Sequence, residues 1–212
     1  MPKRVVEHQD REEFLGIESA RAYAEHARSP MMQRGYHEIA DRIGELGADG
    51  AFLEVGAGPA VLTAIVARAV PQAHITAVEL SPDMITVARE EVDSQGVGDR
   101  IDLVEGDAAD AALLDRLGKF DLVYSSYSLH HWDEPETVIK NLLGAVAPGG
   151  VLFLHDLKRV WWLYWIPFRS GFITSIRAAY TPDEIRDLLV GVAVERCEIE
   201  DGPFYLSAVV RT

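Results

Sequence analysis

A pair of glycines, Gly56 and Gly58, follows a short apolar run and precedes a helical pattern. Such glycines let a strand turn tightly into a helix and let the backbone approach a ligand closely. Acids stand at the ends of this run and of the next two apolar runs: Glu54, Glu79 and Asp107. Because the carboxyl ends of parallel strands meet at one edge of a sheet, we expect the three carboxylates to converge on one ligand.

The same residues indicate what kind of ligand binds. A dinucleotide fingerprint would have its third glycine where Val61 stands. Glu54 would repel a pyrophosphate, whereas it can accept hydrogen bonds from a cationic amino group. Glu79, 21 positions after Gly58, stands where a carboxylate takes both hydroxyls of a ribose, and Asp107 can accept from the amine of adenine. The set favours a zwitterionic ligand that carries a sulfonium; the alternative for each acid alone is a solvated loop residue.

The elements that position these residues follow from the apolar pattern. From Ala51 onward, short apolar runs alternate with helical spacing, which is typical of a parallel sheet wrapped by crossover helices. The predicted strands are 51–55, 74–79, 101–105, 120–125 and 151–155, followed by 193–200 and 204–211. The predicted helices are 60–69, 82–95, 111–117 and 135–146, with a stop at 148–150 and a further helix opened by Thr181 and Pro182.

The N-terminal region reads differently. Residues 1–17 are charged and aperiodic, and two helices are predicted between 17 and 46 with a break at Ser29 and Pro30. We therefore predict an α/β fold: a Rossmann-like, doubly wound, seven-stranded sheet with a C-terminal antiparallel hairpin and an N-terminal helical cap. The expected division is an arm with cap helices at 1–48 and a ligand-binding domain at 49–212, which carries an aromatic insertion at 157–180.

The stretch from Phe52 to about Leu154 resembles class I S-adenosylmethionine-dependent methyltransferases. It is most similar to the small-molecule, methyltransferase type 11/25-like group with an LHHW-like segment after the fourth strand. The matching segments are EVGAGPA, AVELSPDMITVARE, IDLVEGDAAD, FDLVYSSYSLHHW and VAPGGVLFL. They cover about half of the chain in the family's order, which is far more specific than the glycine turn alone.

The resemblance implies S-adenosylmethionine as the cofactor. The residues that would hold it are Glu54, Gly56, Ala57 and Gly58 at the methionine moiety, Glu79 at the ribose, Leu80, Met84, Gly106, Asp107 and Ala108 at the adenine, and Ser125 and Ser126 near the transferred methyl. Tyr23 and Tyr36 of the N-terminal helices are expected to close over it. One departure is Ala60, where the family often has a third glycine; a single methyl is expected to be tolerated there, the alternative being a narrower turn and weaker cofactor binding.

Methyl transfer is an in-line displacement, so the protein mainly aligns and desolvates the nucleophile. A general base is needed for a hydroxyl or ammonium acceptor, and His130 and His131 are the first candidates. The alternative is that one of them, His131, packs the following loop. Tyr127, His155 and Asp156 are weaker candidates. The histidines and Asp156 show no two-ligand spacing, so we predict no metal site.

Acceptor specificity is expected from parts outside the shared core. The predicted substrate-binding residues are Tyr127, Trp161, Trp165 and Phe168. The insertion also contains Trp162, Tyr164 and Phe172, and such density indicates core packing, an apolar ligand wall, a homodimer interface or a membrane-touching surface. Core packing is the reading that general experience favours, and a ligand wall would fit an apolar or aromatic acceptor.

Composition limits the class of protein. The net charge of −14 and pI of about 4.8 disfavour nucleic acid as a partner, and the single cysteine, Cys197, excludes an intramolecular disulfide. The sequence has neither a signal-peptide pattern nor a transmembrane run, so we expect a cytoplasmic protein. Two alternatives to a methyltransferase remain: a non-catalytic S-adenosylmethionine sensor or partner subunit, and a related fold with another reaction or a dinucleotide.

Overall fold

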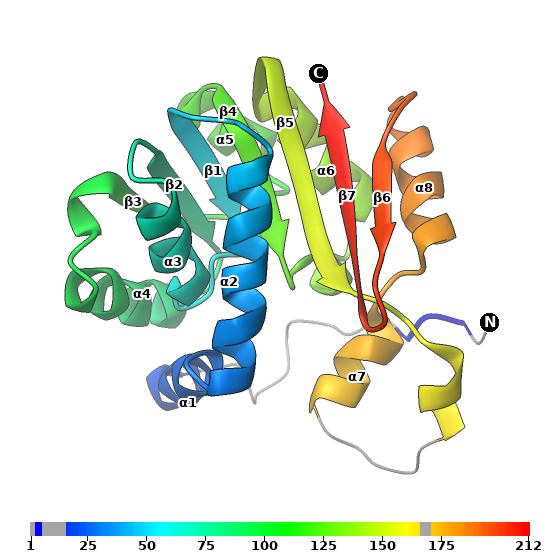
Figure 1. Cartoon of the computed structure of the whole chain (residues 1–212), viewed down its shortest axis with the longest axis horizontal. Helices are drawn as coiled ribbons and strands as arrows, with labels where there is room; N and C mark the ends of the chain where they lie inside the picture. Colours follow the sequence, from blue (N-terminus) through cyan, green and yellow to red (C-terminus); the bar gives the residue numbers. More distant parts are fainter. Residues whose placement is uncertain (1–2, 6–15, 166–170) are drawn as a thin grey trace.

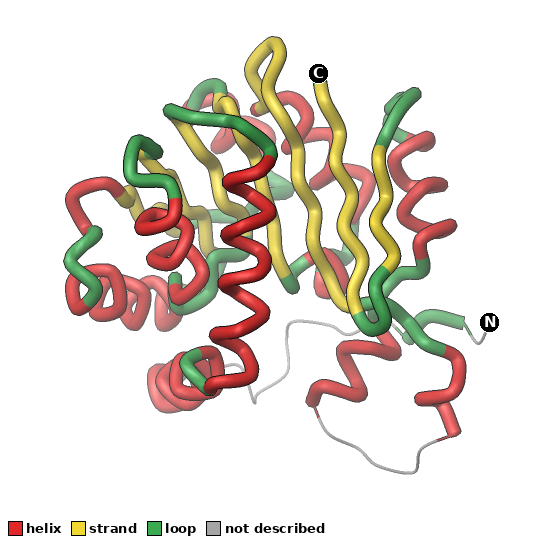
Figure 2. Tube along the Cα trace, viewed as in Figure 1, coloured by secondary structure: helices red, strands yellow, loops and turns green. Residues whose placement is uncertain are grey.

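The computed structural model describes residues 3–5, 16–165 and 171–212, and its strands form one mixed sheet in the order β3-β2-β1-β4-β5-β7-β6. The strands are β1 (Ala51–Val55), β2 (His74–Glu79), β3 (Ile101–Glu105), β4 (Phe120–Ser126), β5 (Val146–Leu157), β6 (Glu198–Asp201) and β7 (Tyr205–Arg211). β1 to β5 run parallel, and β7 lies antiparallel between β5 and β6 (Figure 1). Figure 2 shows the strands, in yellow, as one sheet with the helices, in red, around it. The predicted Rossmann-like sheet with a C-terminal hairpin is confirmed.

Helices cover both faces of this sheet (Figure 1). They are α1 (Ile17–Ala27), α2 (Pro30–Glu45), α3 (Val61–Ala69), α4 (Pro82–Ser94), α5 (Ala111–Leu117), α6 (Pro135–Ala145), α7 (Gly171–Ala178) and α8 (Pro182–Gly191). Short 3-10 turns are η2 (Gly98–Arg100), η3 (Leu129–His131) and η4 (Trp161–Trp165). The predicted caps form: Ser81 accepts from the Met84 amide, and Thr181 makes a capping box with Glu184.

Successive residues of the central strand belong to two separate cores. Phe52 packs in the layer that α2, α3 and α4 share with the sheet, and Leu53 packs in the layer of α5, α6 and α8. Both side chains are fully buried. This alternation is what the apolar runs predicted, because a parallel strand is buried on both faces. The two layers hold the carboxyl ends of the strands rigidly at one edge.

The N-terminal helices form the predicted cap. α1 packs on α4 through Ala20 and Ala24 against Met84 and Val87, and α2 packs on α3. The break falls at Ser29, which precedes Pro30 as the first residue of α2. Across the described residues, no helix has both the length and the apolar character that a bilayer crossing requires.

Two predicted boundaries are wrong. The helix after β4 ends at Ala145, and 148–150 lie within the irregular start of β5, where the pairing register shifts against Phe120 and Leu122. Such an irregularity accommodates proline and a glycine with positive φ. The strand predicted at 193–200 covers only Glu198–Asp201, because Ala193 adopts a left-handed conformation at φ 64° as the chain leaves α8.

Candidate active site

A cleft of about 810 Å³ opens at the carboxyl ends of β1, β2 and β3. This volume lies within the range of small-molecule sites. The sequence-predicted residues that line it are Tyr23, Gly56, Gly58, Glu79, Leu80, Met84, Gly106, Asp107, Ala108, Tyr127 and His131. The ends of β1, β2 and β3 therefore meet at one cleft that Glu79 and Asp107 line, whereas Glu54, the third acid of the predicted set, lines a smaller cavity beside it.

The glycine turn needs glycine at both positions for its positive φ, and at Gly56 also for space. Gly56 has φ 74°, and a Cβ there would stand 2.3 Å from Ser128 Oγ. Gly58 has φ 55°, and its amide donates to the Glu79 carboxylate. Ala60 also has a left-handed backbone, at φ 57°, but it is fully buried and lines neither the cleft nor the smaller cavity beside it. Its cost is backbone strain of about 1 kcal/mol, so a narrower turn is not what its methyl causes.

Backbone amides hold Glu79 and Asp107, the two sequence-predicted acids that line the cleft. Glu79 accepts from the Gly58 amide and from the Ser81 amide, each at 2.9 Å. Burial raises the pKa of Glu79, and the amide hydrogen bonds oppose that shift. Asp107 accepts from the Ala109 amide at 2.8 Å. Each carboxylate is thus fixed in orientation before any ligand arrives.

The carboxylates that line the cleft make it negatively charged. Its acidic lining residues are Glu79, Asp83, Asp107, Asp133 and Glu134. No lysine or arginine is found among the described residues that line it. A diphosphate would meet only repulsion in this cleft, whereas a ligand with positive charge and neutral sugar and base groups would not.

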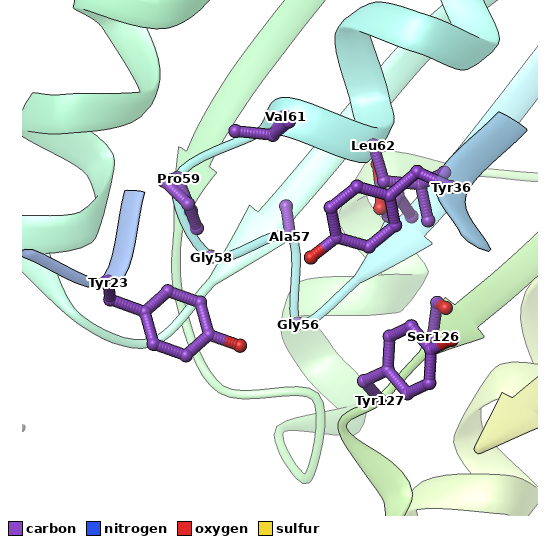
Figure 3. A pocket seen from close by; sticks show the side chains of 11 residues that line it. Tyr23, Tyr36, Gly56, Ala57, Gly58, Pro59, Val61, Leu62, Ser126 and Tyr127 are labelled. Carbon is purple, nitrogen blue, oxygen red and sulfur yellow. The ribbon is translucent and has the colours of Figure 1, made fainter. Parts of the chain in front are cut away.

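A smaller cavity of about 40 Å³ lies against the glycine turn. Figure 3 shows the hydroxyls of Tyr23 and Tyr36 pointing toward each other across the turn, with Tyr127 and Ser126 beside them. The remaining sequence-predicted residues that line it are Glu54, Gly56, Ala57 and Gly58. This cavity joins the N-terminal cap to the strand ends.

Glu54 is 2% exposed and lies at the floor of this smaller cavity. Its carboxylate accepts a hydrogen bond of 2.9 Å from the Tyr124 hydroxyl. Burial raises the pKa of Glu54 to about 7, although that hydrogen bond favours the ionised form. A buried acid of this kind gains from a cationic partner.

Ser125 does not face the cavities as predicted. It is 2% exposed and donates to the Val55 carbonyl at 2.8 Å, so it ties β4 to β1. Its neighbour Ser126 lines the smaller cavity instead. The reason is the alternation of a strand, which points successive side chains to opposite faces.

Of the two candidate histidines, the structure buries His130 and places His131 in the cleft lining. His130 is 2% exposed and lines neither cavity; its amide and Nδ1 lie 2.8 and 2.7 Å from the two oxygens of Asp156. Its Nε2 is buried without a hydrogen-bond partner in the described part of the chain. His131, expected to pack the loop, lines the cleft, and the two rings lie 4.0 Å apart. Their positions differ because Asp156, from the next strand, holds only His130.

His155 supports Tyr127 rather than facing a ligand. Burial lowers the pKa of His155 to about 4, and its Nδ1 lies 2.8 Å from Ser207 Oγ. The Tyr127 ring meets it edge-on at 5.2 Å. Tyr127 itself has φ 53°, and burial raises its pKa. A neutral imidazole thus holds a strained tyrosine at the junction of the two cavities.

The described residues of the aromatic insertion, 157–165 and 171–180, line neither cavity. Trp161 and Trp165 are 60% and 80% exposed and line neither cavity, so the core-packing reading is wrong and their predicted substrate contact is not observed. Val160 and Leu163 fill the local core in their place. Phe168 lies outside the described residues. Within the described ranges, no group of three or more His, Cys, Asp or Glu side chains is arranged to hold a metal ion.

Some lining residues had no predicted role. They are Ser128, Trp132, Asp133, Glu134 and Val138, which follow β4, together with Asp83 at the start of α4. Trp132 donates from its indole to Ser128 Oγ at 3.1 Å, which closes this side of the cleft. Their position after the carboxyl end of a strand was a usable signal.

Residues 53–154 match the profile of the family described as "Methyltransferase domain". This segment is a class I methyltransferase domain. It contains the glycine turn, Glu79, Asp107 and both histidines of η3. The methyltransferase domain therefore supplies every strand end that forms the cleft.

Relatives of the methyltransferase domain differ in what they are named for. A ubiquinone biosynthesis O-methyltransferase from Xanthomonas axonopodis pv. citri is 35% identical over 114 residues, which are 53% of this chain and 45% of that protein. A release factor glutamine methyltransferase from Chlorobaculum tepidum is 37% identical over 91 residues, 41% of this chain and 31% of that protein. The chain thus spans less than half the length of these curated relatives.

A solved structure has the same fold over nearly the whole chain. It is an O-methyltransferase family protein from Burkholderia thailandensis, with a TM-score of 0.78 and 17% identity over 99% of this chain and 64% of that one. This likeness includes the helical cap and the C-terminal hairpin that lie outside residues 53–154.

Proposed function

We propose that the chain transfers a methyl group from S-adenosylmethionine to a small-molecule acceptor. The observation that carries this is the cleft at three adjacent strand ends, which combines a glycine turn with five acids and has no lysine or arginine among its described lining residues. Such a lining accepts a sulfonium and an adenosine but not a dinucleotide diphosphate.

The described residues fit the cofactor. When bound, S-adenosylmethionine supplies a methyl group that its sulfonium already activates. Glu79 binds the ribose hydroxyls, and Asp107 with the Ala108 amide binds the adenine. Leu80 and Met84 flank the base, since both line the same cleft. Glu54 attracts the methionine ammonium in the smaller cavity.

The acceptor is apolar or aromatic. Support comes from the aromatic rings of Tyr23, Tyr127 and Trp132, which line the cleft. These rings take the role first assigned to the tryptophans of the insertion.

His131, which lines the cleft, acts as the general base where the acceptor must lose a proton. Buried His130 lies beside it, with the two rings 4.0 Å apart, and Asp156 holds His130 by accepting from its amide and binding its Nδ1. His130, whose Nε2 has no hydrogen-bond partner among the described residues, is the alternative base.

Calorimetric titration tests the cofactor assignment. S-adenosylmethionine and S-adenosylhomocysteine should bind and a nicotinamide dinucleotide should not. Glu79→Ala and Asp107→Ala should each weaken binding by about 1 to 3 kcal/mol, the size of a lost charged hydrogen bond. Asp115→Ala, an exposed acid on α5 outside the cleft, is the matched control and should bind normally. Unchanged affinity in both cleft variants would show that the cofactor binds elsewhere.

Turnover distinguishes an enzyme from a cofactor sensor. A panel of phenolic and apolar acceptors, scored by release of S-adenosylhomocysteine, should give product with the unmodified chain. His131→Gln should then lower kcat by about 100-fold or more with little change in cofactor affinity, and His130→Gln should not. The reverse pattern would make His130 the base. Cofactor binding without turnover of any acceptor would favour the sensor.

A further inference from the structure

Exposed aromatic side chains gather at one end of the molecule, outside the cleft. Trp161, Trp162 and Trp165 of η4 are 60%, 42% and 80% exposed, and Phe172 of α7 is 54% exposed. Phe204 belongs with them, because its ring lies 6.0 Å from that of Trp162. We call these five residues the tryptophan surface. Figure 1 shows α7 and the yellow segment that follows β5 projecting beyond the end of β5.

The segment that carries the tryptophan surface also has a small packed core of its own. In the same segment Val160 and Leu163 are buried and pack with Ile176 of α7. The Arg177 guanidinium donates to the Leu163 carbonyl at 3.2 Å. The apolar positions that can be buried are therefore already buried, and the tryptophans are the ones that face outward. An exposed cluster of this kind marks a binding surface.

The segment that contains most of the tryptophan surface, 157–180, differs in charge from the rest of the chain. Segment 157–180 holds four of the chain's 20 basic residues and none of its 34 acidic ones, which leaves a net charge of −18 on the remainder. Arg4 joins it from the N-terminus, since it donates to the Ala178 carbonyl at 2.6 Å. Lys158 and Arg159 pair with Asp201 and Glu184, so attraction for an anion is moderate and the rings must supply much of the binding.

We propose that the tryptophan surface docks the protein onto a membrane that contains anionic phospholipid. Tryptophan has an apolar ring with one polar N–H, which suits the headgroup level of a bilayer. Segment 157–180 contributes no acid to this face, and two neighbouring acids, Asp201 and Glu184, are paired with its Lys158 and Arg159, so this part of an acidic chain can approach a negative surface. A second copy fits less well, because a symmetric contact would set the acid-free segment against itself.

Docking there brings the membrane close to the cleft. α7 contacts η3, and η3 carries His131 in the cleft lining. An apolar acceptor dissolved in the bilayer would thus reach the site by a short path. The docking goes beyond the proposed methyl transfer and does not depend on it, since the surface shares no residue with either cavity.

Tryptophan fluorescence with vesicles tests the proposal directly. The surface holds three of the four tryptophans, and the fourth, Trp132, is 8% exposed. Vesicles of phosphatidylcholine mixed with phosphatidylglycerol should shift the emission to shorter wavelength and sediment the protein. Phosphatidylcholine alone, or high salt, should weaken binding. Trp161→Ser with Trp165→Ser should lower vesicle affinity by about tenfold or more.

Matched variants separate this result from folding and from the cofactor site. Val190→Ser removes an apolar side chain that is 64% exposed on α8 and should bind vesicles normally. Glu79→Ala should lose cofactor affinity and keep vesicle binding, whereas the double tryptophan variant should do the opposite. Equal vesicle binding by the double variant and the unmodified chain, or no binding by either, would overturn the proposal. So would a homodimer that the double variant disrupts.

Discussion

At the scale of single residues, Gly56 carries the sharpest steric requirement of the site. Its φ of 74° and the 2.3 Å approach to Ser128 Oγ leave no room for a side chain. We expect Gly56→Ala to destabilise the fold by about 2 kcal/mol or more and to abolish cofactor binding. Gly44→Ala is the matched control, because nothing lies within 4 Å of a Cβ there and the helix should gain about 0.5 to 1 kcal/mol. Urea unfolding and calorimetry of both variants measure this.

The buried carboxylate of Glu54 lowers the stability of the ligand-free protein and attracts a cationic ligand. Its folded pKa of about 7 lies above the ordinary 4.5, so its contribution to stability is full below pH 4.5 and is lost as the pH rises through about 7. Glu54→Gln should therefore stabilise the ligand-free protein by about 1 to 3 kcal/mol at pH 8 and by much less at pH 5. The same variant should bind S-adenosylmethionine more weakly. A pH-independent gain in unfolding free energy would contradict the burial of a charge at this position.

Residues at strand ends were predictable and the two histidines were not. Gly56, Glu79 and Asp107 follow apolar runs, and parallel strands bring the ends of such runs together whatever the rest of the chain does. The positions of His130 and His131 depend on Asp156, which lies 26 residues further along and reaches only one of them. The sequence around the two histidines gives no indication of that contact.

At the scale of elements, α8 depends on its start. The Thr181 side chain accepts from the Glu184 amide, and Glu184 accepts in return from the Thr181 amide at 2.9 Å. Thr181→Ala should cost about 1 kcal/mol of unfolding free energy. Thr86→Ala, on the exposed side of α4, removes a threonine that bonds within its helix to the Pro82 carbonyl and should cost less than 0.5 kcal/mol or so. Equal losses in both would mean that the capping box does not stabilise α8.

The aromatic insertion shows where element prediction fails. No helix was predicted within it, although it forms η4 and α7, and its residue spacing does not indicate which rings are buried. Leu163 and Ile176 take the buried positions because they fit the small core under α7, and this leaves the tryptophans outside. The dense aromatic composition of the insertion instead favoured burial of the tryptophans, since aromatic stripes usually pack in a core.

At the scale of the whole molecule, cofactor binding should raise thermal stability. A ligand at about 100 times its Kd adds about 2.7 kcal/mol, which for a chain of this size corresponds to a rise in Tm of about 5 to 10 °C. Thermal denaturation with S-adenosylhomocysteine should show this rise, and Glu79→Ala should show little of it at the same ligand concentration. A rise of equal size in both proteins would place the ligand away from the acidic cleft.

The position of β7 in the sheet determines when the sheet can be completed during synthesis of the chain. Its residues, Tyr205–Arg211, are translated after every other described strand, yet β7 lies between β5 and β6. Until β7 leaves the ribosome, β5 has an open edge and β6 has no neighbour, and open edges recruit strands of other chains. Nascent chains stalled before Tyr205 should therefore associate with chaperones, whereas chains extended past Arg211 by a flexible spacer should not.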